Sequence, residues 1–172
     1  KNKTVIMPSE EVDKKMFLST INYLEQKNYM HYEISNFSKK NKKCEHNLHY
    51  WRLEPYLAFG PGAHGFNGIK RWWNKKSIDY YLNKLEKNEL PIESEEILSP
   101  KDAFNETIMN GLRLIEGAKI KKLNSYLDMD IKEHLEPYME KWPYINDNGK
   151  NLTVKKEGLL FTDEIITDLF LI

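Results

Sequence analysis

The chemically capable side chains of this chain gather in one stretch, CEHNLHYWRLEPYLAFGPGAHG, from Cys44 to Gly65. It holds the only cysteine, three of the five histidines and several aromatic residues. A C-x-H-x2-H spacing matches no standard zinc pattern, and no second ligand pair follows it. A Cys44–His46 nucleophile pair is also poorly supported, because no third orienting group is evident. A single histidine in an aromatic surround remains suited to ligating a heme iron, and a hydrogen-bonded loop histidine is the alternative.

Glycines in GPGAHG come directly after the apolar run Tyr56 to Gly60, which we expect to form a short buried strand. Glycines there let a backbone approach a ligand closely, or simply make a tight turn. The segment is neither a dinucleotide fingerprint nor a P-loop. Upstream, the run Tyr29 to Ser35 is also expected to be a strand, with a polar loop before the next strand. This order favours an α/β layer with a parallel sheet.

Helices should flank these segments. Ser9 and Ser99 are expected to cap the helices that begin beside them, and another helix should begin at Ser77. The first of these helices should end near Asn28. The acidic stretch NELPIESEEILSPKD, residues 88–102, has the composition of a linker. Asn148-Gly149 predicts a hairpin near the end of the chain. Helices followed by a hairpin resemble a winged-helix arrangement.

Composition excludes several classes of protein. Of the 172 residues, 40% are hydrophobic and 30% are charged, and the formal net charge is zero. That is typical of a soluble protein with a core, and it gives no sign of nucleic-acid binding. A lone cysteine excludes an internal disulfide and fits a reducing cytoplasm. The sequence has no transmembrane segment. Because it reads from Lys1 like the middle of a longer chain, we expect a fragment.

Six segments together resemble the C-terminal half of the HemW family. They are YEISNFS, CEHNLHYW, YLAFGPGAHG, RWWN, GLRLIEG and LTVKKEGLL, in that order. HemW proteins are radical SAM proteins similar to oxygen-independent coproporphyrinogen III oxidase, and the HNxxYW motif separates the heme-binding proteins from the oxidase. The resemblance implies a mixed α/β (α+β) fold. Residues 1–95 would be the C-terminal part of a partial radical SAM (β/α) barrel, and residues 98–172 a small helical domain with a winged-helix-like hairpin.

Site residues follow from the same resemblance. It implies that His46, Asn47, Tyr50 and Trp51 bind heme, with His46 on the iron. It also implies that Gly60, Gly62, Ala63, Tyr32 and Glu33 lie near S-adenosylmethionine. The family's [4Fe-4S] cluster needs three cysteines, and this chain has one, so we expect the chain alone to be inactive as a radical SAM enzyme.

The function implied is heme binding and delivery to acceptor proteins. A fragment of a coproporphyrinogen III oxidase and a winged-helix interaction module are the alternatives. Self-association and peripheral membrane contact are further expectations for a partial barrel.

Overall fold

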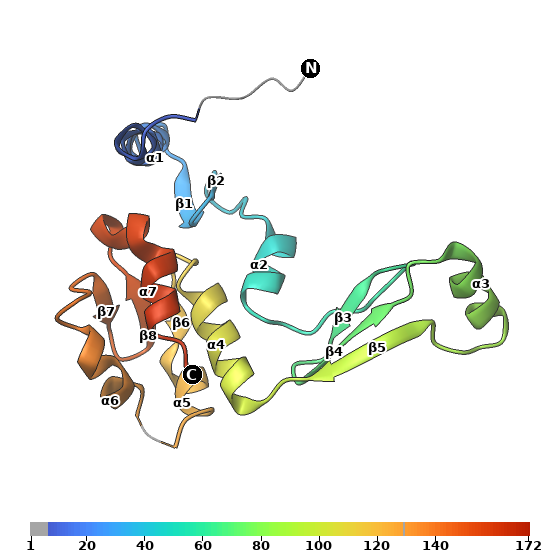
Figure 1. The fold of residues 1–172 in the computed structure, drawn as a ribbon. Coiled ribbons are helices and arrows are strands. Elements are labelled where there is room, and N and C mark those ends of the chain that lie inside the picture. Colours follow the sequence, from blue (N-terminus) through green and yellow to red (C-terminus); the bar gives the residue numbers. More distant parts are fainter. Residues whose placement is uncertain (1–6, 129) are drawn as a thin grey trace.

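The computed structural model describes residues 7–128 and 130–172. Figure 1 shows a cluster of helices and short strands from which a strand-rich arm extends to one side. We call residues 64–97, which form β3, β4, α3 and β5, the arm, and residues 100–168, from α4 through α7, the helical unit. Helix α2, Glu45–Trp51, lies between them. The mixed helix and strand content agrees with the fold class expected from the sequence.

The first part of the chain is a helix followed by a hairpin. Helix α1 spans Glu10–Gln26, and the Ser9 hydroxyl accepts a hydrogen bond from the Val12 amide, as predicted. Strand β1, Met30–Glu33, pairs antiparallel with β2, Asn36–Ser38. Ile21 anchors α1 because it is buried in the main core, beside the helical unit.

Helix α2, Glu45–Trp51, occupies part of the segment for which a polar loop was predicted. Leu48 is its buried residue, and it packs with Tyr32 of β1 and Leu114 in a small second core. Burial of one leucine therefore holds a short helix that has no side-chain cap at Cys44.

The arm is an antiparallel sheet with the strand order β3-β4-β5. Its elements are β3 His64–Phe66, β4 Lys70–Asn74, α3 Ile78–Glu86 and β5 Ile92–Ile97. Since β5 lies within the predicted linker, that prediction is wrong. The parallel sheet is also wrong for the described residues, in which every strand pair is antiparallel.

The predicted buried strand at Tyr56 to Gly60 is wrong as well. Tyr56 alone makes a β-bridge, to Phe66. Leu57 and Phe59 are mostly exposed, so this apolar run does not enter a core.

The helical unit carries the main core. Its elements are α4 Pro100–Gly111, β6 Ala118–Lys119, α5 Ile120–Asn124, α6 Ile131–Leu135, the 3-10 helix η1 Glu136–Tyr138, β7 Ile145–Asp147, β8 Asn151–Val154, the 3-10 helix η2 Lys156–Phe161 and α7 Thr162–Asp168. The strands form an antiparallel sheet in the order β6-β8-β7. The hairpin predicted at Asn148-Gly149 joins β7 to β8, with Gly149 at φ 80°. A helix, a strand, two helices and a hairpin in this order confirm the winged-helix-like arrangement.

None of the helices in the described part of the chain has the length and apolar character needed to cross a bilayer.

Candidate functional site

A cavity of about 670 Å³ lies where α2, the arm and α4 meet. Helix α2 provides one wall through Asn47, Tyr50 and Trp51. These residues are spaced i, i+3 and i+4, so they share one face of the helix. The structure thus brings three of the four residues expected to bind heme into one cavity.

One face of the arm sheet provides another wall. In the antiparallel register His64 lies opposite Trp73, and Phe66 lies opposite Arg71. Residues directly opposite each other project from the same side of a sheet. All four line the cavity, so the register of two short strands sets this wall.

Aromatic contacts continue from one wall to the other. The Tyr50 and Tyr56 ring centroids are 4.7 Å apart, and those of Tyr56 and Phe66 are 6.2 Å apart. Small-molecule sites are commonly cavities of roughly 300–1,000 Å³ with mostly apolar, aromatic walls and a few polar groups. The cavity therefore has the size and lining for a flat aromatic ligand.

His46 lies beside this cavity and does not line it. It is exposed in the first turn of α2, and its ring meets Tyr50 edge to face with centroids 5.0 Å apart. The imidazole makes no hydrogen bond to any residue that the structure describes. Its ring nitrogens therefore have no partner among the described residues, and its only link to the cavity that we see is the contact with Tyr50, a lining residue.

The two neighbouring candidates differ from His46. Both ring nitrogens of His49 have partners, because Nδ1 is 2.7 Å from the Glu54 carboxylate and Nε2 is 2.6 Å from the Pro55 carbonyl oxygen. Cys44 is exposed and makes no capping hydrogen bond. His49 thus stabilises the turn after α2, and Cys44 has no structural partner at the helix end.

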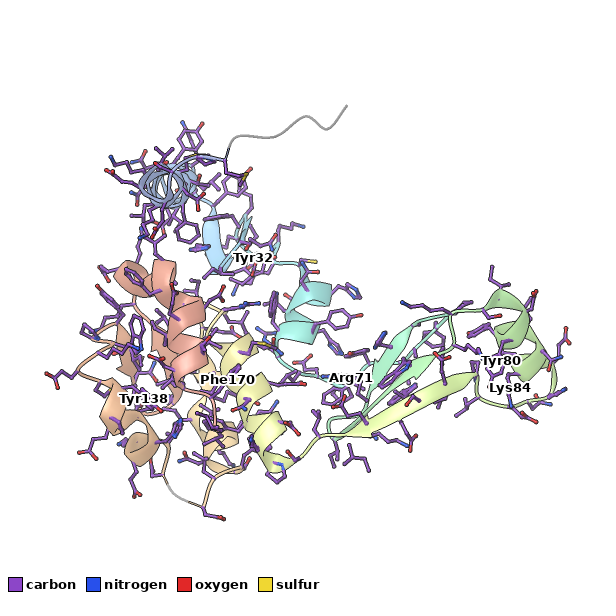
Figure 2. The ribbon with its side chains drawn as sticks, in the orientation of Figure 1. Tyr32, Arg71, Tyr80, Lys84, Tyr138 and Phe170 are labelled. Atoms are coloured by element: carbon purple, nitrogen blue, oxygen red, sulfur yellow. The ribbon has the colours of Figure 1, made fainter. Side chains whose placement is uncertain are left out.

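Arg71 carries the main positive charge of the cavity and also joins the arm to α4. Its Nη2 donates to Glu106 Oε2 at 2.8 Å, and both side chains are half-buried. The hydrogen bond that Arg71 donates to this carboxylate raises the pKa of its guanidinium. Figure 2 shows Arg71 between the arm and the helical unit.

Among the residues expected near S-adenosylmethionine, Gly60, Gly62 and Ala63 form a turn against the arm. Gly60 and Gly62 have φ values of 99° and 69°, which favour glycine. The Tyr81 hydroxyl accepts the Gly60 amide at 3.0 Å, and Asn74 Nδ2 donates to the Gly60 carbonyl oxygen at 2.9 Å.

Tyr32 and Glu33, the other two expected residues, lie on β1 against the chain that follows α4. Glu33 is 1% exposed, and its Oε1 accepts the Ser35 amide at 3.2 Å and the Asn36 side-chain amide. The Tyr32 carbonyl oxygen accepts the Ile115 amide at 3.2 Å. These two residues and the Gly60–Ala63 turn therefore contact different neighbours.

The sequence reasoning missed the arm's contribution to the cavity. His64, Phe66 and Trp73 were not singled out as site residues, although a signal for their hairpin exists. Asn67-Gly68 separates two aromatic runs, and Asn67 Oδ1 accepts the amides of Ile69 and Lys70. Gly68 takes the positive φ of 98° that such turns require. A second Asn-Gly hairpin was thus readable from the sequence.

No cluster of three or more His, Cys, Asp or Glu side chains in residues 7–128 and 130–172 is arranged to hold a metal ion.

Comparison with known proteins agrees with the resemblance seen in the sequence. Residues 98–161 match the family model described as the HemN C-terminal domain. The heme chaperone HemW of Mycobacterium tuberculosis is 30% identical over 138 residues, which cover 80% of this chain and 34% of that protein. A putative heme chaperone HemW-like protein of Buchnera aphidicola is 34% identical over 158 residues, covering 88% of this chain and 41% of that protein.

A solved structure has the same fold. It is coproporphyrinogen III oxidase (HemN) from Escherichia coli, a radical SAM enzyme, with a TM-score of 0.65 and 15% sequence identity. The match covers 95% of this chain and 42% of that one. The chain spans about a third of the length of the first curated relatives that it matches, 34% and 31% of them in two cases. With its match to the HemN C-terminal domain and its HemW relatives, the chain belongs to the HemW family and matches the C-terminal part of its members.

Proposed function

We propose that this chain forms the heme-binding part of a HemW-like heme chaperone. The observation that carries the proposal is the aromatic cavity against α2, because Asn47, Tyr50 and Trp51 of the HNxxYW motif line it together. Relatives that cover most of this chain are named heme chaperones. A porphyrin needs a large site with aromatic walls, and the aromatic residues that line this cavity are Tyr50, Trp51, Tyr56, Phe66 and Trp73.

His46 would be the ligand to the iron of the bound heme. Its free ring nitrogens and its contact with Tyr50 support this role. Heme is the molecule delivered here and not a catalyst. The protein must therefore hold the porphyrin, ligate its iron through an imidazole and then release the heme. An exposed ligand at the rim suits release, because an acceptor can reach the iron there without unfolding the site.

In the whole protein, a [4Fe-4S] cluster and S-adenosylmethionine would accompany this part. We propose that Gly60, Gly62, Ala63, Tyr32 and Glu33 lie toward S-adenosylmethionine, that heme-accepting proteins are the partners and that the protein is cytoplasmic. Residues 1–95 would complete the barrel side, and residues 98–172 would form the C-terminal domain.

Titration with hemin tests the ligand assignment. We expect the wild-type protein to give a ligated Soret spectrum, and His46→Ala to lose or shift it. Cys44→Ser should retain the spectrum because the thiol is exposed and has no partner. His49→Ala should retain it as well, since both nitrogens of that ring are engaged elsewhere.

An unchanged spectrum and affinity in His46→Ala would contradict the assignment of His46. Product analysis with coproporphyrinogen III distinguishes the chaperone from the alternative function, the oxidase. Conversion of its propionates to vinyl groups by the whole protein would favour the oxidase, and hemin binding without conversion favours the chaperone.

A further inference from the structure

We propose that His64 is a second ligand to the iron of a porphyrin bound in the cavity, acting from the arm wall while His46 acts from the rim of α2. The inference rests on the proposed function and adds a residue outside the HNxxYW motif. Of the five histidines, His64 alone is among the residues that line this cavity.

The remaining histidines have other surroundings. His31 stacks on Phe37, with centroids 4.4 Å apart, and its Nε2 lies 3.1 Å from the Ile34 carbonyl oxygen. His134 packs on Phe104 in the helical unit, and its Nε2 lies 2.9 Å from the Leu169 carbonyl oxygen. His64 makes no ring hydrogen bond to any described residue, so both of its nitrogens are available to a ligand in the cavity.

The backbone fixes where the His64 ring lies. Strand alternation places His64 and Phe66 on the cavity side of β3 and Gly65 on the other side. The His64 ring stacks on Trp73, its cross-strand partner, with centroids 5.9 Å apart and planes at 27°. An aromatic neighbour on a rigid hairpin restricts the imidazole before any ligand binds, which lowers the entropic cost of ligation.

The two histidines come from different elements, and this difference bears on release. His46 belongs to α2, which packs on Tyr32 and Leu114 through Leu48. His64 belongs to the arm, which is joined to α4 by the Arg71–Glu106 ion pair. A shift of the arm against α2 would change one ligand of the iron and leave the other in place, so ligation would respond to the arm's position.

Paired porphyrin titrations test the inference. Hemin and metal-free protoporphyrin IX would be titrated into the wild type, His64→Phe and the control His31→Phe, by absorption and by fluorescence. His64→Phe keeps a ring against Trp73 and removes both nitrogens. His31→Phe makes the same change at a stacked histidine outside the cavity.

We expect His64→Phe to lose the low-spin, six-coordinate features of the hemin spectrum and to bind hemin about tenfold more weakly or worse. Tenfold is the smallest loss of affinity that we expect, because mutating a residue that only hydrogen bonds to a metal ligand already costs roughly 10–100-fold in metal affinity. Its affinity for metal-free protoporphyrin IX should stay within about twofold of wild type, because only the iron ligand is lost and cavity packing is kept. His31→Phe should match the wild type with both porphyrins.

An unchanged hemin spectrum and affinity in His64→Phe would overturn the role of His64 and leave the proposed function standing. Equal weakening toward both porphyrins would also overturn it, since His64 would then act by packing alone. If the wild type bound neither porphyrin, the proposed function itself would fail and this inference with it. Loss of the ligated spectrum in His64→Phe but not in His46→Ala would support His64 as an iron ligand and would exclude His46 from that role.

Discussion

Gly65 occupies a position in β3 at which a side chain would collide with Trp72. A Cβ built there lies 2.3 Å from two indole carbons of Trp72. The missing side chain lets the indole cross β3 on the face opposite the cavity, while His64 and Trp73 occupy the cavity face. A single glycine therefore lets the hairpin carry aromatic rings on both of its faces.

Gly65→Ala should displace the Trp72 ring and destabilise the protein by about 1–3 kcal/mol, the usual cost of forcing extra atoms into a packed site. Urea unfolding measures the loss. The control is Trp72→Leu, in whose background Gly65→Ala should cost clearly less, because the clashing ring is gone. Equal costs in both backgrounds would show that Trp72 is not the reason for glycine here.

At the scale of elements, local capping signals made the helices predictable. Ser9 and Ser99 cap α1 and α4 as expected, and the helix expected to begin at Ser77 is α3, which Ser77 also caps. Each signal acts within one turn, so it needs no tertiary information. Helix α2 escaped prediction because burial of Leu48 holds it, and burial depends on β1 and on the chain after α4.

Strands depend on partners that are distant in the sequence, and the wrong predictions of secondary structure concern strands. Tyr56–Gly60 is apolar in sequence, yet only Tyr56 has a β partner. Strand β5 was taken for a linker because an edge strand tolerates the acids that a linker also has. For the candidate site, Asn47, Tyr50 and Trp51 were named through the family motif, although the helix that carries them was not predicted. The arm wall was not predicted, because it depends on the register of two strands.

The capping box of α4 gives a prediction with a pH dependence. The Ser99 hydroxyl donates to Asp102 Oδ2 at 2.6 Å and accepts the Asp102 amide at 3.1 Å. The hydrogen bond from the Ser99 hydroxyl lowers the pKa of Asp102, followed by that from the Ser99 amide. A lowered folded-state pKa contributes stability above the unfolded-state pKa, near 4, and this stability is lost as the pH falls through the folded-state value.

Ser99→Ala should therefore cost about 1 kcal/mol of unfolding free energy at pH 7. The difference from wild type should narrow below about pH 4, as Asp102 becomes protonated. Chemical denaturation at a series of pH values measures it. Ser9→Ala is the control, since Ser9 caps α1 through the Val12 amide with no acid at the Val12 position. A pH-independent cost for Ser99→Ala would rule out the coupling to Asp102.

At the scale of the whole molecule, the arm is held to the helical unit by few contacts. The ion pair between Arg71 of β4 and Glu106 of α4 is one of them, at 2.8 Å. Lys70, the adjacent residue, pairs instead with Glu95 of β5, inside the arm, at 2.8 Å. Of two adjacent cations on β4, one therefore forms an ion pair within the arm and the other forms an ion pair with the helical unit.

Arg71→Met should loosen the base of the arm, because it leaves the half-buried Glu106 without its cation. Hydrogen exchange should become several-fold faster at Tyr56 and Phe66, which are hydrogen bonded to each other there. Lys70→Met is the matched control and should leave exchange at that base unchanged. Similar exchange in the two variants would mean that the Arg71–Glu106 pair does not hold the arm.

Strand β5 has a paired neighbour on one side only among the described strands, which leaves a row of backbone groups open to another chain. Such an edge invites strand addition and aggregation unless charge discourages it. Glu93, Glu95 and Glu96 stand along six residues of β5, IESEEI. Another molecule that tried to extend this sheet with a similar strand would bring like charges together. The acidic residues that give this segment the composition of a linker therefore disfavour polymerisation through the edge of the arm.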